Sequence, residues 1–171
     1  MHWGAVRTSW GIFHAAWDEH GICRLEFPGR RPAARPTSSQ LLTRLTRELE
    51  AFFQGERREF SLPLSLAGTP FQLAVWEELR KVPYGTVVSY GELASRIGHP
   101  RAARAVGGAV GANPVPILIP CHRVVRASGE LGGFGPGPEW KRRLLELEGA
   151  LEKGPGRLLG GRAPSAAPAE A

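Results

Sequence analysis

One short stretch of the sequence places a thiol beside an imidazole at the end of an apolar run. Residues 116–125 read Pro-Ile-Leu-Ile-Pro-Cys-His-Arg-Val-Val, so Cys121 and His122 are adjacent. A cysteine becomes a strong nucleophile when a nearby base or positive field favours its thiolate. Adjacent side chains of an extended strand point to opposite faces, so this pair can cooperate only where the backbone turns, or through a water molecule. The stretch predicts a nucleophilic cysteine assisted by a histidine.

A histidine that acts as a base needs a partner that orients its ring, preferably a carboxylate. Glu148 is one candidate, Glu130 and Glu139 are others, and sequence spacing does not choose among them. Cysteine peptidases also pair cysteine with histidine, but their histidine usually lies far away in sequence and an Asn or Asp completes the site. A thiol hydrolase is therefore the weaker interpretation of this pair.

The composition is that of a basic chain with little cysteine. The 171 residues carry a net charge of +6, and 42% of them are hydrophobic, enough to build a core. A basic balance suits a polyanion such as DNA, although a basic surface without such a partner has the same composition. Cys23 and Cys121 lie far apart and form no CxxC pair, so we expect neither disulfides nor a metal site. No apolar run approaches membrane-spanning length, and we expect no membrane partner and a cytoplasmic protein.

Apolar spacing predicts an N-terminal α/β domain over residues 1–67. Residues 3–27 alternate between apolar and polar types around turn-like glycines, which is typical of a hairpin or small sheet. Residues 40–53 repeat apolar side chains at helical spacing, and residues 59–66 alternate again as a strand. The domain boundary is expected near Ala67 and Gly68.

Residues 68–152 are predicted to form a second, mainly helical domain, and residues 153–171 a disordered tail. The fold class is therefore α/β (α+β), with a small sheet-plus-helix domain packed on a mainly helical domain that contains a helix-turn-helix. Spacing and capping residues predict helices over residues 71–82, 89–97, 101–111 and 138–147.

The second helix of this predicted helix-turn-helix is unusual for a reader of the major groove. Such a helix needs several long side chains that reach base edges. The run from Arg101 to Gly111 is almost all alanine, valine and glycine, although each glycine costs a helix about 1 kcal/mol relative to alanine. Close packing of two backbones explains the small residues. A helix that lies tight against a narrow groove, with Arg104 as its probe, explains them equally well.

The stretch Ile119–Val125 resembles the active-site motif of the O6-alkylguanine-DNA alkyltransferases, which repair DNA by direct reversal. The resemblance covers residues 69–150 strongly and residues 3–66 weakly. Its further motifs are Thr86-Val87-Val88-Ser89-Tyr90-Gly91-Glu92-Leu93-Ala94, Ala102-Ala103-Arg104-Ala105-Val106-Gly107-Gly108-Ala109, Gly111-Ala112-Asn113-Pro114 and Trp140-Lys141 through Glu148-Gly149.

The resemblance implies a self-alkylating enzyme that flips the damaged base out of the duplex. Cys121 would take the alkyl group from O6-alkylguanine, and from O4-alkylthymine, while His122 takes the thiol proton through a water molecule. Glu148 would orient His122, and Tyr90 would hold the base and protonate the departing ring. The thioether product is a poor leaving group, so each molecule would act once and without a cofactor.

The resemblance also implies which residues bind DNA. Double-stranded DNA with O6-alkylguanine is the expected partner, bound by a monomer through its minor groove, with Arg104 filling the place of the flipped base. Asn113 would tie the turn that precedes the active-site segment. The residues expected at the DNA interface are Ala102, Ala103, Arg104, Gly107, Gly111, Asn113 and Arg123, and those expected to line the base pocket are Pro116, Val124, Phe134 and Gly135.

The sequence departs from the family pattern at two positions, and two other functions compete with alkyl transfer. Phe134 stands where the family often has tyrosine, and Pro136 removes an amide donor, which leaves the accepted alkyl groups open. A lesion-sensing protein without enzymatic activity is the main alternative, but such relatives lack the cysteine that Cys121 supplies. A helix-turn-helix regulator would need sequence-specific binding, which the small residues of the second helix disfavour.

Overall fold

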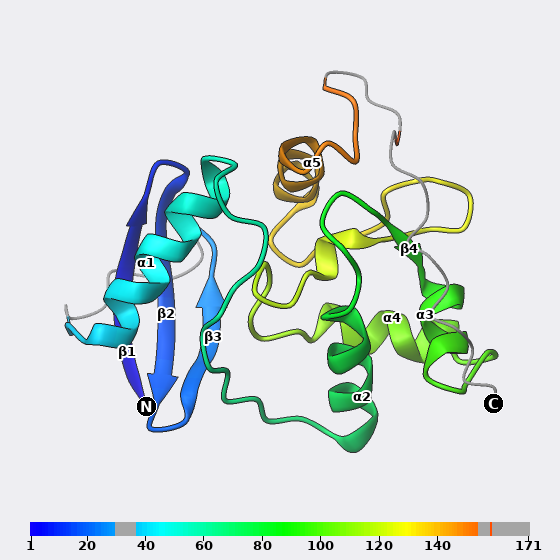
Figure 1. Cartoon of the computed structure of the whole chain (residues 1–171). Coiled ribbons are helices and arrows are strands. Elements are labelled where there is room, and N and C mark those ends of the chain that lie inside the picture. Colours follow the sequence, from blue (N-terminus) through cyan, green and yellow to red (C-terminus); the bar gives the residue numbers. More distant parts are fainter. Residues whose placement is uncertain (30–36, 154–157, 159–171) are drawn as a thin grey trace. The chain divides into compact units, whose positions relative to one another are not determined.

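The computed structural model describes residues 1–29, 37–153 and 158, and the chain divides into two compact units (Figure 1). Unit 1 comprises Met1–Ala67 and Pro114–Leu118, and unit 2 comprises Gly68–Asn113 and the chain from Ile119 onward. Apart from Lys153 and Leu158, the tail expected at residues 153–171 lies outside the described residues. The mixed α/β class is confirmed, with a small antiparallel sheet and five α-helices among the described residues.

Unit 1 is a three-stranded antiparallel sheet with one helix. The strands pair in the order β1-β2-β3, and Val6 lies opposite Phe13 in the register of β1 and β2. Both side chains are fully buried, as are Leu45, Leu49 and Phe52 of the helix, whose N-cap Ser39 accepts a bond from a backbone amide of the first turn. These elements are β1 (His2–Thr8), β2 (Gly11–Asp18), β3 (Gly21–Glu26) and α1 (Gln40–Phe53).

The prediction of a strand at residues 59–66 is wrong. Only Leu64 forms a bridge, with Ile22 of β3. The amide of Ile22 donates to the Pro63 carbonyl at 2.9 Å, and its carbonyl accepts from Ser65 at 2.8 Å. Pro63 has no N–H group with which to extend a ladder. Gly21 has a φ of 148°, and a Cβ atom there would overlap the Pro63 carbonyl, so this approach requires glycine.

Unit 2 is mainly helical. Two of its helices begin with capping boxes, at Thr69 with Gln72 and at Ser89 with Glu92, so the side chains and backbone amides satisfy each other. The helix expected over residues 71–82 ends at Leu79. The elements are α2 (Pro70–Leu79), β4 (Val88–Ser89), α3 (Tyr90–Arg96), α4 (Ala103–Gly111), the 3-10 turn η1 (Cys121–Arg123), β5 (Val124–Val125) and α5 (Pro138–Leu147).

The segment of residues 114–118 belongs to unit 1, although the chain on both sides of it belongs to unit 2. The amide of Leu25 in β3 donates to the Pro114 carbonyl at 2.9 Å. Ile117 is buried and has a φ of 77°, a region that a β-branched residue rarely enters because its side chain meets the backbone. The segment that leads to Cys121 therefore contains a strained backbone conformation at Ile117.

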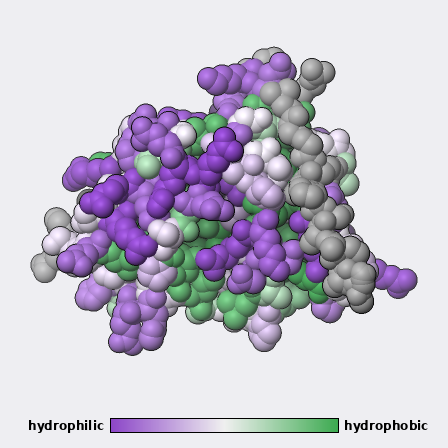
Figure 2. All heavy atoms as spheres, in the orientation of Figure 1, coloured by the Kyte–Doolittle hydropathy of each residue, from purple (hydrophilic) through white to green (hydrophobic). Residues whose placement is uncertain are grey.

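Figure 2 shows hydrophilic residues over much of the visible face. Among the described residues, no helix combines the length and apolar character needed to cross a membrane.

Candidate active site

Cys121 and His122 lie in a turn rather than in an extended strand. They form η1 together with Arg123, and the amide of Arg123 donates to the Pro120 carbonyl at 3.1 Å. All three side chains are buried, and His122 is fully so. Neighbouring residues of such a turn need not point to opposite faces, so the backbone turn that cooperation between the thiol and the imidazole requires is present.

Glu148 is the carboxylate that meets the imidazole. The Nε2 atom of His122 lies 2.7 Å from Oε2 of Glu148, and both side chains are completely inaccessible to solvent. Glu148 is the C-cap residue of α5, which brings it to η1 from 26 residues away in sequence. Glu130 and Glu139, the other two candidates, are exposed.

Arg123 binds both oxygens of the same carboxylate. Its Nε donates to Oε1 of Glu148 at 2.9 Å and its Nη2 donates to Oε2 at 2.8 Å. Its Nη1 donates to the Val82 carbonyl at 2.7 Å, and the guanidinium lies 5.7 Å from the centroid of the Tyr84 ring. Arg123 was expected at the DNA interface. That expectation is corrected here, because its buried guanidinium binds Glu148 and the backbone.

The charges of this group follow from its contacts. Burial would raise the pKa of Glu148, but His122 and Arg123 together lower it to about 2, so the carboxylate is ionised. Burial also lowers the pKa of His122, an effect stronger than the opposing pull of Glu148, so the imidazole is neutral. We assign the ion pair to Arg123 and Glu148, because two hydrogen bonds from the guanidinium hold the carboxylate.

The position of the proton on His122 follows from this ionised carboxylate. A carboxylate only accepts hydrogen bonds, so Nε2 carries the ring proton and Nδ1 keeps a free lone pair. Nδ1 is buried and has no hydrogen-bond partner among the described residues. The ring is thus oriented and polarised by Glu148 with its basic nitrogen available.

The thiol of Cys121 is buried and hard to ionise. Burial raises its pKa to about 11, while a hydrogen bond with Asn113 and the charge of Lys141 act in the opposite direction. The Nδ2 atom of Asn113 also donates to the Ile119 carbonyl at 2.9 Å. This bond connects the residue after which the chain leaves unit 2, Asn113, to the residue at which it returns, Ile119.

Tyr90, the first residue of α3, is half-buried near the thiol. Burial raises the pKa of Tyr90, the charge of Cys121 raises it further, and Arg126 opposes both. A Cβ atom added to Gly132 would lie 3.4 Å from the Tyr90 hydroxyl, and one added to Gly107 would lie 3.8 Å from its ring. The loop at Gly132 and helix α4 therefore flank the tyrosine.

Helix α4 has one packed face and one open face. Val106, Ala109 and Val110 are buried, and the indole of Trp76 donates to the Ala109 carbonyl at 2.8 Å. The opposite stripe is exposed and carries Arg104, Gly108 and Gly111 at helical spacing. No atom lies within 4 Å of where a Cβ on Gly108 or Gly111 would be. Close packing therefore does not explain these two glycines, whereas Gly107 does face Tyr90. Ala102 and Ala103, also expected at the interface, are partly exposed at the start of the helix.

The four residues expected to line the base pocket fall in three places. Val124 is fully buried directly after η1. Phe134 is partly buried and Gly135 is exposed in the loop that precedes α5. Pro116 is buried in the segment of unit 1.

A residue that sequence reasoning missed is Lys141. It is fully buried in α5, and its Nζ donates to the Val124 carbonyl at 2.6 Å and to the Gly133 carbonyl at 3.2 Å. One signal was available. The chain has 19 arginines and only three lysines, and Lys141 lies three and four residues before Leu144 and Leu145, on the apolar face of the helix.

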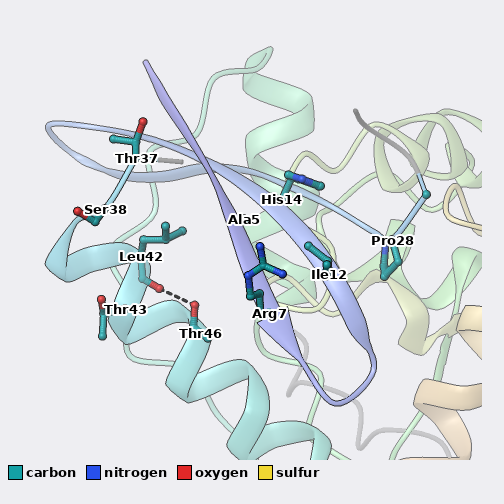
Figure 3. Close-up of a pocket in the computed structure, with 11 residues that line it drawn as sticks. Ala5, Arg7, Ile12, His14, Pro28, Thr37, Ser38, Leu42, Thr43 and Thr46 are labelled. Carbon is teal, nitrogen blue, oxygen red and sulfur yellow. Dashed lines mark hydrogen bonds between the residues drawn. The ribbon is translucent and has the colours of Figure 1, made fainter. Parts of the chain in front are cut away.

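A cavity of about 940 Å³ lies in unit 1, between β1, β2 and the start of α1 (Figure 3). Arg7, His14 and Thr46 are among the residues that line it, and none of the expected site residues does. Among the described residues, no group of three or more His, Cys, Asp or Glu side chains could hold a metal ion.

Comparison with known proteins identifies the family. Residues 70–150 match the model of the 6-O-methylguanine DNA methyltransferase, DNA binding domain, and residues 1–66 match the ribonuclease-like domain of the same proteins. A methylated-DNA–protein-cysteine methyltransferase of Methanosarcina acetivorans is 39% identical over 155 residues, which cover 88% of this chain and 99% of the relative. The chain belongs to the methylated-DNA–protein-cysteine methyltransferase family. This membership confirms the family and the enzyme class that the motif around Cys121 predicts.

Other members of the family agree. A Mycobacterium bovis protein of the same name is 56% identical over 101 residues, which cover 59% of this chain and 61% of the relative. The crystal structure of Mycobacterium tuberculosis OGT in complex with DNA is 41% identical, with a TM-score of 0.79, and the match covers 87% of this chain and 93% of that chain. These likenesses support DNA repair and DNA binding as the setting for the site around Cys121.

Proposed function

We propose that this chain repairs DNA by direct reversal, moving the alkyl group of O6-alkylguanine in duplex DNA onto Sγ of its own Cys121. The observation that carries the proposal is the buried group in which Cys121 adjoins His122, whose Nε2 lies 2.7 Å from Glu148. Relatives are named for methyl transfer from DNA to a protein cysteine, and one such fold has been solved with DNA bound.

The first step is loss of the thiol proton. With Nε2 bound to Glu148, the free lone pair of Nδ1 on His122 accepts the proton of Cys121 through a bridging water molecule. A base is needed because the pKa of the thiol is about 11, so few molecules ionise spontaneously at neutral pH. Arg123 supports this step because it balances the charge of Glu148 and leaves His122 neutral.

The second step is a displacement at the alkyl carbon. A bond forms between Sγ of Cys121 and this carbon, the bond from carbon to O6 breaks, and its electron pair moves into the guanine ring. Tyr90 holds the base and donates its hydroxyl proton to the ring as guanine departs. The proton that His122 took from the thiol then returns through water to the Tyr90 oxygen. The net exchange is an alkyl group for the thiol proton, which leaves normal guanine in the DNA.

The DNA is bound through α3 and α4. The exposed stripe of Arg104, Gly108 and Gly111 has no bulky side chain except the arginine, which suits close approach to a minor groove. The target base must leave the stack to reach a buried thiol, and Arg104 is long enough to fill the space it vacates. Ala102 and Ala103 extend this surface at the start of α4.

The reaction ends with a thioether on Cys121, and a thioether is a poor leaving group. Each chain therefore acts once, as a monomer and without a cofactor. The same displacement applies to O4-alkylthymine, in which the alkyl carbon is also bound to an exocyclic oxygen.

The test is intact mass spectrometry after the chain is mixed with duplex DNA that carries one O6-methylguanine. We expect one added methylene per chain, located on Cys121 and absent in Cys121→Ala. Tight binding to this duplex without a mass change would instead support a lesion sensor. Absence of both would contradict a role in repair of this lesion.

A further inference from the structure

Lys141 is a buried charge that the proposed reaction does not use. Its side chain is fully buried, and its two partners are the backbone carbonyls of Val124 and Gly133. Among the described residues no carboxylate forms an ion pair with it. Burying an ammonium group without a counter-ion is costly, and carbonyl dipoles compensate only partly. Retaining this lysine therefore needs a reason beyond packing.

The two carbonyls belong to different parts of the site. Val124 directly follows η1, which carries Cys121, and Gly133 belongs to the loop that precedes α5. The neighbouring Gly132 faces the Tyr90 hydroxyl. By bonding both carbonyls, Lys141 joins the backbone that bears the thiol to the loop that flanks Tyr90.

The charge of Lys141 also acts on the thiol. Burial raises the pKa of Cys121, and Lys141 opposes that rise. Burial lowers the pKa of Lys141 to about 8, which Cys121 opposes and the exposed Arg126 reinforces. Burial lowers the pKa of His122 and raises that of Tyr90, so both shift away from pH 8.

We propose that Lys141 is a positioning residue, which fixes the backbone of the Cys121 turn against the Gly133 loop and keeps a positive charge beside the reacting sulfur. This inference rests on the proposed function, in that the sulfur it serves is the one that receives the alkyl group. A role in packing alone would make the lysine matter for stability but not for the reactivity of the thiol.

The coupling predicts a specific pH dependence. Two states of the pair carry the same number of protons: the Cys121 thiolate with a charged Lys141, and the Cys121 thiol with a neutral Lys141. Because they do not differ in protons, the ratio between these two states does not change with pH. Once the lysine titrates, near pH 8, the reactive thiolate fraction should therefore rise less steeply with pH. An isolated thiol of pKa about 11 would instead gain about tenfold per pH unit across the same range.

The experiment follows reaction of the folded, DNA-free protein with iodoacetamide between pH 6 and 10. The Cys121 thiolate displaces iodide and forms a thioether, and digestion with mass spectrometry reports this residue separately from Cys23. In the wild type we expect the Cys121 rate to rise by clearly less than tenfold per pH unit above about pH 8. In Lys141→Gln we expect a rate about tenfold lower at pH 7 that keeps rising to pH 10.

The controls separate this role from folding and from repair. Lys81→Gln removes an exposed lysine that pairs with Glu78, and it should leave the Cys121 profile unchanged. A wild-type rate that rises tenfold per pH unit up to pH 10 overturns the proposal even if Lys141→Gln fails to fold. Identical profiles for the wild type and Lys141→Gln overturn it as well. If the iodoacetamide profile is as expected but O6-methylguanine DNA adds no methyl group, the proposed function fails and the coupling stands.

Discussion

Arg123 and Glu148 form a buried ion pair with two parallel hydrogen bonds of 2.9 and 2.8 Å, and His122 shares the same carboxylate at 2.7 Å. The arginine therefore supplies the positive charge that a buried carboxylate needs. The histidine is left neutral, which is the state in which it can accept a proton from Cys121.

Replacing Arg123 with methionine should raise the pKa of His122, because the unpaired carboxylate would favour its protonated form. The alkyl-transfer rate should then fall by about tenfold or more at pH 7 and recover partly at higher pH. Loss of one partner from a buried pair should also cost about 3–5 kcal/mol in the free energy of unfolding. Transfer rates from pH 6 to 9, with denaturant unfolding, check both effects, and an unchanged pH profile would contradict the assignment.

Glu148 should make stability depend on acid pH. Its pKa is depressed from 4.5 to about 2 in the folded chain, so its contribution is complete above about pH 4.5 and is lost as pH falls through 2. The shift corresponds to about 3 kcal/mol. Unfolding of the wild type and of Glu148→Gln, compared at pH 5 and pH 2.5, should show a difference that shrinks by an amount of this order. A difference that does not change with pH would contradict the pairing.

Replacing Arg104 with alanine should change stability by less than about 0.5 kcal/mol, since the side chain is exposed. Methyl transfer from duplex DNA should fall substantially, while the rate of Cys121 with iodoacetamide stays the same. Arg47→Ala removes an exposed arginine of α1 and serves as the matched control. Equal loss of transfer in both variants would show that only net charge matters.

Gly108 distinguishes the two explanations for the small residues of α4. Because nothing lies within 4 Å of an added Cβ, Gly108→Leu should fold, and its helix should gain several tenths of a kcal/mol to about 1 kcal/mol. If this stripe lies against DNA, the larger side chain should weaken binding to duplex DNA. Unchanged affinity in a fluorescence anisotropy titration would exclude Gly108 from the interface.

Local signals predicted the helices well. The bounds of α1 and α5 match their expected ranges, because apolar spacing and clear start signals agree there. The strand expected at residues 59–66 failed because alternation says nothing about partners, and Pro63 cannot continue a ladder. Periodicity thus identifies a helix more securely than a strand, whose bonds are made elsewhere in the chain.

The sequence analysis named candidate site residues, but it did not predict which of them contact one another. Glu148 could not be separated from Glu130 and Glu139 by spacing, because what selects it is the place where α5 ends. Sequence reasoning did not predict that the charges of Arg123 and Lys141 are buried. Only the folded chain shows that both long side chains turn inward, one to a carboxylate and the other to backbone carbonyls.

The segment of residues 114–118 limits how the chain can be divided. A fragment that begins at Gly68 would retain Cys121, His122 and Glu148, yet it would lose the unit to which this segment belongs. Val115, Ile117 and Leu118, all buried in the whole chain, would then face solvent just ahead of the nucleophile. The N-terminal half therefore helps to bury the segment that leads to the nucleophile. A chain truncated at the apparent boundary would keep every reactive group and still expose this apolar segment.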